Sequence, residues 1–180
     1  MKTIVRAALP AFGALSLIAF AAAAAGDQKS GNLKQRLIGS WTMVSDTVDQ
    51  GGTKVAPFGP SPKGSMILTA DGRFSIVLTR PDVPKFASGS RTGGTAEENK
   101  AAMAGGIGYF GTYTVSEPDK TVHLHVEAST FPNWTGTDQT RIAALSGNDL
   151  TVTNPTPSIG AGTATLVWKR AGQTRQTAQK

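Results

Sequence analysis

The sequence contains no cysteine and only a small share of aromatic and charged residues. Of its 180 residues, 7% are aromatic and 17% are charged. Without cysteine the chain cannot form a disulfide, a thiolate metal site, a cysteine nucleophile or the lipid-bearing cysteine of a bacterial lipoprotein. Glycine (21 residues) and proline (10 residues) are abundant, which predicts short elements joined by many turns. The length predicts one folded domain.

The net charge of +6 does not indicate a nucleic-acid-binding protein. Six of the basic residues lie towards the two ends of the chain: Lys2, Arg6, Lys169, Arg170, Arg175 and Lys180. Positions 26 to 168 then hold 12 basic residues and all 12 acidic ones. A groove that follows phosphates needs clustered lysine and arginine, and this central part of the chain is neutral. We therefore expect no nucleic-acid partner.

Residues 1–25 have the three regions of a secretory signal peptide. A cationic start with Lys2 and Arg6 precedes an apolar stretch that ends in a run of alanines. The small residues at its end suit signal peptidase, which predicts a mature protein that begins near Gly26. A retained membrane anchor is the alternative, but the stretch is alanine-rich and Pro10 interrupts it. We expect a periplasmic or secreted bacterial protein with no membrane span in the mature chain.

The remaining sequence is dominated by a pattern of strands and turns. A helical turn at residues 33–38 ends at Gly39. Asp71-Gly72, between two apolar segments, is the strongest hairpin signal in the chain. The eight predicted strands span residues 40–48, 65–69, 73–80, 109–115, 121–129, 139–145, 150–153 and 163–170. Short turns join nearly all neighbours, which predicts an all-β protein with an eight-stranded antiparallel up-and-down barrel.

Three segments depart from this pattern. Residues 51–62 are rich in glycine and proline and predict a long loop. Residues 82–108 form a long inter-strand loop with one short helix, in which Thr95 is the N-cap and Glu98 completes a capping box. Residues 171–180 contain no large apolar residue, which predicts a disordered basic tail.

The first strand predicts one core residue. Trp41, Met43 and Ser45 alternate with Thr42, Val44 and Asp46. The face that carries Trp41 is the more apolar one, so the indole is expected in the core at the closed end of the barrel, with Asp46 on the opposite face.

Several short motifs follow one another along the chain. Gly39-Ser40-Trp41 comes directly after the helical turn and opens the first strand. The more specific motifs are Pro57-Phe58-Gly59, Pro62-Lys63-Gly64, Thr69-Ala70-Asp71-Gly72-Arg73, Arg80-Pro81, Tyr109-Phe110-Gly111-Thr112-Tyr113, His125-Val126-Glu127 and Phe131-Pro132-Asn133-Trp134-Thr135-Gly136-Thr137. In this order they resemble the bacterial lipocalin-like domain family. The resemblance runs from about Leu37 to Arg170 and implies a lipocalin-like barrel that could hold a small apolar or amphipathic molecule. We expect this barrel domain to span residues 26–170.

The strand at residues 121–129 carries both histidines of the chain on one face, together with Glu127. In one interpretation His125 and Glu127 point into the barrel, where burial raises the pKa of the glutamate and the pair works as an acid-base couple. In the other interpretation this face is the solvated exterior. The resemblance places both residues at matching family positions, although Leu124 stands where that family has a second histidine.

A metal site on this strand is not expected. His123 and His125 have a suitable spacing, but Glu127 cannot reach the same ion as His123, because four residues of strand span about 13 Å.

Four more residues are candidates for ligand contact. Arg141 is either a clamp for an anionic group inside the barrel or a structural arginine stacked on a tryptophan such as Trp41. Arg80 either lines the mouth or is a surface charge. Tyr109 and Trp134 suit a ligand wall and a packed core equally.

We therefore expect an exported barrel that binds a small hydrophobic or amphipathic molecule and uses no cofactor. Its candidate ligand-binding residues are Arg80, Tyr109, His125, Glu127, Trp134 and Arg141. One alternative is an enzyme of the cyclase, isomerase or lyase kind with His125 and Glu127 as proton-transfer groups. The other is a noncatalytic interaction or stress module with a barrel filled by its own side chains.

Overall fold

The structure is a computed structural model that describes residues 31–172. The elements in this range are α1 (Leu33–Leu37), β1 (Gly39–Gln50), β2 (Thr53–Val55), β3 (Lys63–Leu68), β4 (Arg73–Thr79), α2 (Ala96–Gly105), β5 (Gly106–Ser116), β6 (Thr121–Ser129), a 3-10 turn at Pro132–Trp134, β7 (Asp138–Ser146), β8 (Asp149–Asn154) and β9 (Thr163–Arg170). The signal peptide predicted over residues 1–25 lies outside the described residues, as do residues 173–180 of the predicted tail.

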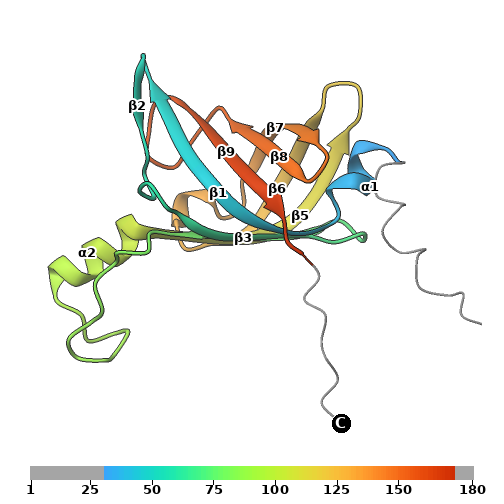
Figure 1. Cartoon of the computed structure of the whole chain (residues 1–180). Coiled ribbons are helices and arrows are strands. Elements are labelled where there is room, and N and C mark those ends of the chain that lie inside the picture. Colours follow the sequence, from blue (N-terminus) through green and yellow to red (C-terminus); the bar gives the residue numbers. More distant parts are fainter. Residues whose placement is uncertain (1–30, 173–180) are drawn as a thin grey trace, which may run out of the picture.

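Eight of these strands close into a ring. From β3 to β9 each strand pairs with the next one along the chain, β1 pairs with β3, and β9 pairs back with β1. All of these pairings are antiparallel. The predicted eight-stranded antiparallel up-and-down barrel is therefore confirmed (Figure 1). The closure between β1 and β9 satisfies the backbone groups that an open sheet would leave at its edges.

β2 is an additional strand in a segment that the sequence predicts to be a loop. It pairs only with the end of β1, Gln50 lying opposite Thr53. The turn between them consists of Gly51 and Gly52, both with positive φ. Because β2 has three residues and no apolar alternation, its sequence does not distinguish it from a loop. The hairpin extends beyond the ring (Figure 1).

α1 covers one end of the barrel. Leu33 and Leu37 are buried, and the Leu37 carbonyl accepts a 2.9 Å hydrogen bond from the indole of Trp41. The carboxylate of Glu117, in the β5–β6 turn, accepts hydrogen bonds from the backbone N–H groups of Leu33 and Lys34. These bonds attach the helix to the barrel wall, because they use N–H groups that have no partner within a helix.

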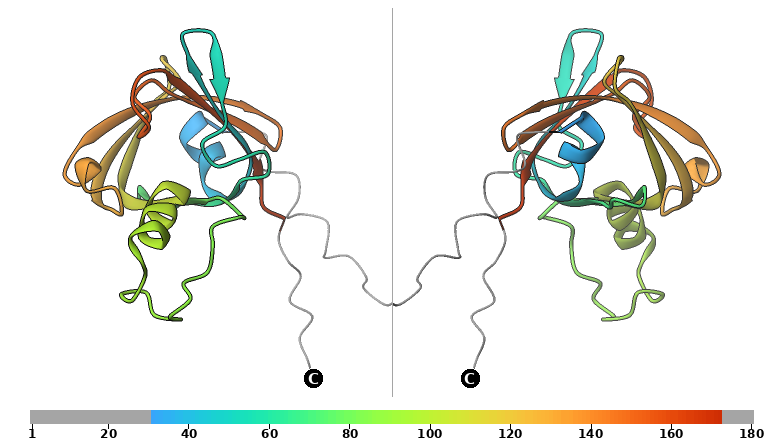
Figure 2. Two further views of the ribbon diagram at one scale, coloured as in Figure 1. Left: turned by 90° about the vertical axis from the view of Figure 1, so that its left-hand side faces the viewer. Right: turned by 90° about the vertical axis from the view of Figure 1, so that its right-hand side faces the viewer.

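The opposite end is the mouth. The β1–β2 hairpin and the loops β2–β3, β4–β5, β6–β7 and β8–β9 all lie there. β1, β4, β6 and β8 run away from α1, and the β2–β3 loop leads into β3, which runs back towards it. Figure 2 (left) looks towards this end, with α1 visible behind the ring of strands. α2 lies in the β4–β5 segment beside the mouth, and its capping box of Thr95 and Glu98 is present as predicted. Within residues 31–172 no helix is long and apolar enough to cross a membrane.

Two β-bulges reverse the inside-outside alternation of their strands. In β1, Met43 lies opposite Trp168 and Ser45 lies opposite Val167, so Val44 is the extra residue. In β6, Glu127 is the extra residue, because Val126 and Ala128 face consecutive residues of β5. A bulge changes the parity of every residue beyond it. Asp46 therefore points inwards, against the expectation from simple alternation.

Candidate functional site

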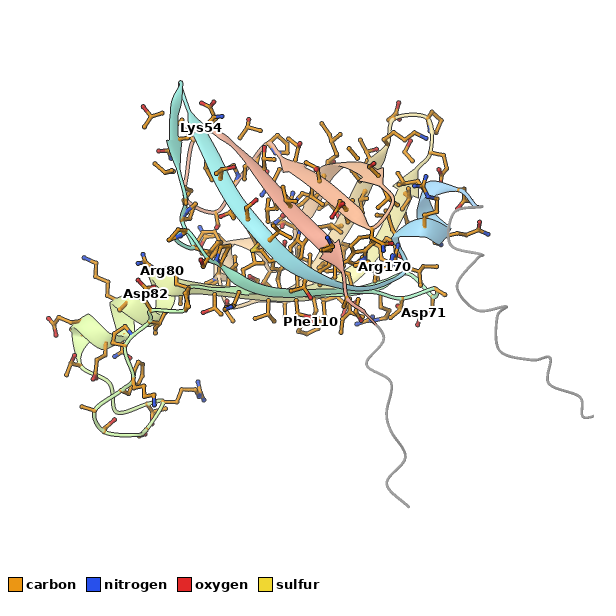
Figure 3. The ribbon with its side chains drawn as sticks, viewed as in Figure 1. Lys54, Asp71, Arg80, Asp82, Phe110 and Arg170 are labelled. Carbon is orange, nitrogen blue, oxygen red and sulfur yellow. The ribbon has the colours of Figure 1, made fainter. Side chains whose placement is uncertain are left out.

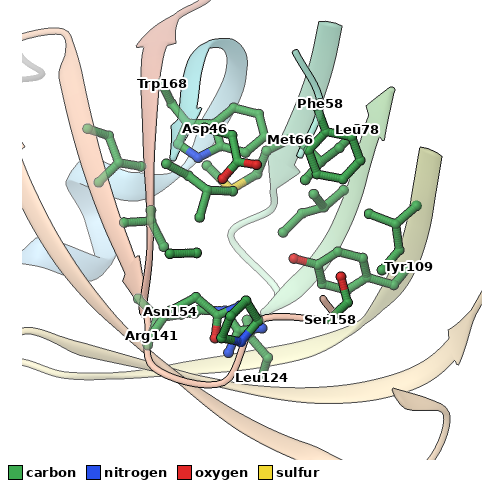
Figure 4. Close-up of a pocket in the computed structure, with 18 of the residues that line it drawn as sticks. Asp46, Phe58, Met66, Leu78, Tyr109, Leu124, Arg141, Asn154, Ser158 and Trp168 are labelled. Atoms are coloured by element: carbon green, nitrogen blue, oxygen red, sulfur yellow. The ribbon is translucent and has the colours of Figure 1, made fainter. Parts of the chain in front are cut away.

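The barrel encloses a cavity that extends from α1 to the mouth (Figure 4). Leu37 of α1 contributes to its wall at the closed end, and Phe58 and Ile159 contribute from the β2–β3 and β8–β9 loops at the mouth. Its free volume, counted for the centres of water-sized spheres, is about 70 Å³, and the cavity is open to solvent at the mouth. Most of the wall is aliphatic or aromatic. A largely apolar cavity with a few polar groups is the usual form of a small-molecule site.

Asp46 is the acidic residue of the cavity wall. Its side chain is buried, at 4% exposure, and it points into the cavity (Figure 4). Among residues 31–172 no hydrogen bond or ion pair reaches its carboxylate. Burial raises its pKa from 3.8 to about 6. A buried carboxylate without a partner is costly, so its presence in an apolar barrel indicates a role beyond packing.

Arg141 is the basic residue of the wall, with 4% exposure on β7. Its guanidinium donates to the Thr140 carbonyl over 2.9 Å and to the side-chain oxygen of Gln139. It also lies 5.6 Å from the ring centroid of Trp134. These contacts hold the guanidinium in place without an acidic partner among the described residues. Its planar donors remain suited to a carbonyl or another acceptor in the cavity.

Aromatic rings form the wall near Arg141. Tyr109 packs edge-to-face on Trp134, with ring centroids 5.1 Å apart, and on Phe74, with ring centroids 5.8 Å apart. Burial raises the pKa of the Tyr109 hydroxyl, against the opposing effect of the nearby Arg141. The hydroxyl is therefore a neutral donor and acceptor that faces the cavity (Figure 4).

Two further polar groups of the wall belong to strands β8 and β9. The side-chain oxygen of Asn154 accepts from the backbone N–H of Thr156 over 3.0 Å, which leaves its amide N–H groups for the cavity. The indole Nε1 of Trp168 is buried and has no hydrogen-bond partner within the described part of the chain. Trp168 and Asp46 lie on the neighbouring strands β9 and β1.

Three of the six sequence-predicted ligand residues lie in this cavity: Tyr109, Trp134 and Arg141. The other three do not line it: the placement of His125 and Glu127 in a barrel site is corrected, because both lie on the outer face of β6, and Arg80 is an exposed charge just beyond the end of β4. The inward face of β6 belongs instead to Val122, Leu124 and Val126, which are buried.

Each of these three residues has a polar partner at the surface. Glu127 forms a two-pronged ion pair with Arg73, with both distances 2.9 Å. His125 lies 2.7 Å from Asp138. Arg80 pairs with Asp82 beyond the end of β4, beside α2 (Figure 3). Within residues 31–172 no cluster of histidine and carboxylate side chains could hold a metal ion.

Asp46, Asn154 and Trp168 are cavity residues that the sequence interpretation did not select. Regular alternation places Asp46 outside, and the bulge at Val44 brings it inside. Asn154 ends β8 at a Pro/Gly-rich loop, and Trp168 resembles any other core aromatic in the sequence. The sequence of β1 mixes polar and apolar residues, so Asp46 can be placed on the inner face only when the register of β1 against β9 is known.

The family comparison agrees with this architecture. A family model described as a lipocalin-like domain matches residues 38–171. The chain is 30% identical over 105 residues to the 4'-hydroxy-3'-methoxypropiophenone carrier protein of Aspergillus oryzae, an alignment that covers 53% of this chain and 95% of that protein. A solved structure of a biogenic amine-binding protein gives a TM-score of 0.38 at 12% identity, and the match covers 77% of this chain and 66% of the other. The family model and the carrier protein together establish that this chain belongs to the lipocalin-like domain family.

Proposed function

We propose that this protein binds and carries a small, largely apolar molecule inside its barrel. The observation that carries the proposal is the cavity, whose apolar wall contains an acidic, a basic and several neutral polar groups. Such a wall accommodates a hydrophobic body and orients it through a few hydrogen bonds.

The name of the Aspergillus oryzae relative supports a carrier role. That protein is named for a neutral aromatic ketone with a phenolic hydroxyl. The aromatic wall of Tyr109 and Trp134 suits a flat ring of this kind. We propose a small aromatic or similarly amphipathic ligand for this chain.

We do not assign proton-transfer catalysis to His125 and Glu127. Both side chains lie on the outer face and pair with Asp138 and Arg73. They cannot reach a molecule held in the barrel, so the enzyme alternative loses the groups on which it rested.

The proposal is tested by filling the cavity from one position. Ala143 on β7 is buried and lines the cavity, whereas Ala144, the next residue, faces outwards. Ala143→Phe should abolish binding of Nile red and of 4'-hydroxy-3'-methoxypropiophenone, and Ala144→Phe should leave both affinities unchanged. Fluorescence titration measures both. Equal binding by the two folded variants would place any ligand outside the barrel and contradict the proposal.

We also propose that the protein acts outside the cytoplasm. The support is the order of cationic, apolar and small residues over positions 1–25. The intact mass of the protein recovered from the periplasm or medium should correspond to a start near Gly26. A recovered mass that still contains the first 25 residues would contradict this proposal.

A further inference from the structure

We infer that Asp46 selects the ligand, by accepting a hydrogen bond from a hydroxyl group of a neutral molecule whose opposite end presents an acceptor to Arg141. This inference rests on the proposed function and names the class of molecule that the barrel takes: hydroxylated aromatic ketones and compounds with the same polarity.

The first step is the unused acceptor. The Asp46 carboxylate is buried, faces the cavity and has no partner among residues 31–172. Buried carboxylates are ordinarily hydrogen-bonded or paired, because desolvation of an unpaired one costs several kcal/mol. A group that donates a hydrogen bond from within the cavity satisfies this requirement.

The second step is an unused donor on the adjacent strand. Asp46 lies opposite Leu166 of β9, and Trp168 is two residues further along the same strand. Both side chains line the cavity, so they are diagonal neighbours on its wall. The Trp168 indole N–H has no partner in the described structure. A hydroxyl can donate to the carboxylate beside this buried indole without adding a charge there, whereas an ammonium group adds one.

The third step is the charge of the cavity. Of the described residues that line it, Asp46 and Arg141 are the charged ones, and they balance each other. A neutral ligand preserves this balance. A cationic ligand leaves one positive charge in excess in an apolar interior, and a carboxylate ligand leaves one negative charge in excess. The wall therefore favours neutral molecules.

The fourth step is the other end of the ligand. Arg141 and the amide of Asn154 present donors to the cavity and have no acidic partner there. A carbonyl oxygen of the ligand accepts from these groups. The site then recognises a hydrogen-bond donor at one end of the ligand and a hydrogen-bond acceptor at the other.

Protonation of Asp46 weakens this recognition. The titratable groups that share the cavity wall with it are Tyr109 on β5 and Arg141 on β7. With its pKa near 6, Asp46 is mostly charged at pH 7.5 and mostly neutral at pH 5. A hydrogen bond to a neutral acceptor is weaker than one to a carboxylate, which corresponds to a loss of affinity of about 5- to 10-fold between these pH values.

The experiment uses three probes and three variants. The probes are 4'-hydroxyacetophenone, its methyl ether 4'-methoxyacetophenone, and the cation 4-(aminomethyl)acetophenone, titrated by calorimetry at pH 7.5. The variants are Asp46→Asn, Asp46→Leu and, as the matched control, Asp49→Asn on the exposed face of the same strand. Circular dichroism verifies that each variant is folded.

The parent protein and Asp49→Asn should bind the hydroxyl probe about 10- to 150-fold more tightly than its methyl ether, the value of one charge-assisted hydrogen bond. Asp46→Asn should reduce this preference, and Asp46→Leu should reduce it to less than about 3-fold. The methyl ether should bind the parent and Asp46→Leu with similar affinity.

Three results would overturn the inference. The first is that the parent binds 4'-hydroxyacetophenone and its methyl ether equally. The second is that Asp46→Leu retains the preference for the hydroxyl probe over the ether. The third is that the cationic probe binds the parent most tightly. Nile red distinguishes these failures from failure of the proposed function. If Nile red enters the barrel of the parent and Ala143→Phe excludes it, only the role of Asp46 is wrong. If neither Nile red nor any acetophenone binds, the proposed function fails and this inference fails with it.

Discussion

The guanidinium of Arg170 lies 4.2 Å from the centroid of the Trp41 ring. The same guanidinium donates to the carbonyl of Ile38 over 2.9 Å and to the carbonyl of Arg36. The last residue of β9 therefore joins the first strand and the end of α1 at the closed end of the barrel. The sequence interpretation that placed Trp41 in the core at this end is confirmed, since the ring is 1% exposed.

Trp41→Ala should destabilise the protein by about 3 to 5 kcal/mol. The substitution removes a fully buried ring and leaves a cavity beneath α1. It also removes the hydrogen bond to the Leu37 carbonyl and the stacking partner of Arg170. Urea unfolding monitored by circular dichroism measures the change. A loss below about 1 kcal/mol would show that the ring is peripheral to stability.

Arg170→Lys should cost about 1 to 3 kcal/mol although it conserves the charge. Lysine cannot stack a planar group on the indole, nor can it reach two carbonyls with a fixed fork of donors. The control is Lys169→Ala, the exposed neighbour, which should change stability by less than about 0.5 kcal/mol. If the two variants unfold at the same urea concentration, the Arg170 contacts do not hold the closed end.

Asp46→Asn should stabilise the unliganded protein at neutral pH. The folded state raises the pKa of Asp46 to about 6, from 3.8, so it binds the proton more tightly than the unfolded state does. The wild-type protein therefore loses stability relative to the variant as pH rises through this window, and the loss is complete above about pH 7. A shift of about two pKa units corresponds to about 3 kcal/mol.

The comparison between the two proteins isolates this effect from other titrating groups. The difference in the free energy of unfolding should grow between pH 4 and pH 7 and stay constant from pH 7 to pH 8. Urea unfolding at these pH values measures it. A difference that does not vary with pH would mean that the Asp46 carboxyl is not desolvated in the folded protein.

The fold could be predicted because its determinants are local. Alternation identifies each long strand, and turns such as Asp71-Gly72 separate the strands, with Gly72 at φ 85°. Short connections then leave the antiparallel meander as the natural arrangement, and closure follows from the number of strands. The capping box of α2 is equally local, because its two residues lie three positions apart.

The site could be predicted only in part, because its composition depends on register between strands. The bulge at Val44 arises where β1 pairs with β9, a partner more than 100 residues away, and it alone brings Asp46 inside. Alternation in β6 separates His125 from Leu124 without showing which face is internal. The stacking of an arginine on Trp41 was a correct expectation with the wrong arginine: Arg170 occupies that position, and Arg141 stacks on Trp134.

Arg141→Ala should weaken ligand binding, whereas His125→Ala should not. The Arg141 guanidinium lines the cavity, so a carbonyl that accepts from it loses a charge-assisted hydrogen bond in the variant, which corresponds to a roughly 10- to 150-fold loss of affinity. His125 is on the outer surface beside Asp138 and does not line the cavity. Lys54→Ala, at the β1–β2 hairpin, is a second control with an exposed side chain (Figure 3). Titration of 4'-hydroxyacetophenone against the parent and the three variants measures the four affinities.

A second comparison tests whether Arg141 acts through the ligand carbonyl. Because Arg141 also stacks on Trp134, its variant must first be shown to be folded. The affinity for 4'-hydroxyacetophenone should then be compared with that for 4-ethylphenol, which lacks the carbonyl. If Arg141 donates a hydrogen bond to the carbonyl, Arg141→Ala loses the preference of the parent protein for the ketone over 4-ethylphenol. An equal loss for both compounds would instead mean that the residue acts through the shape of the wall.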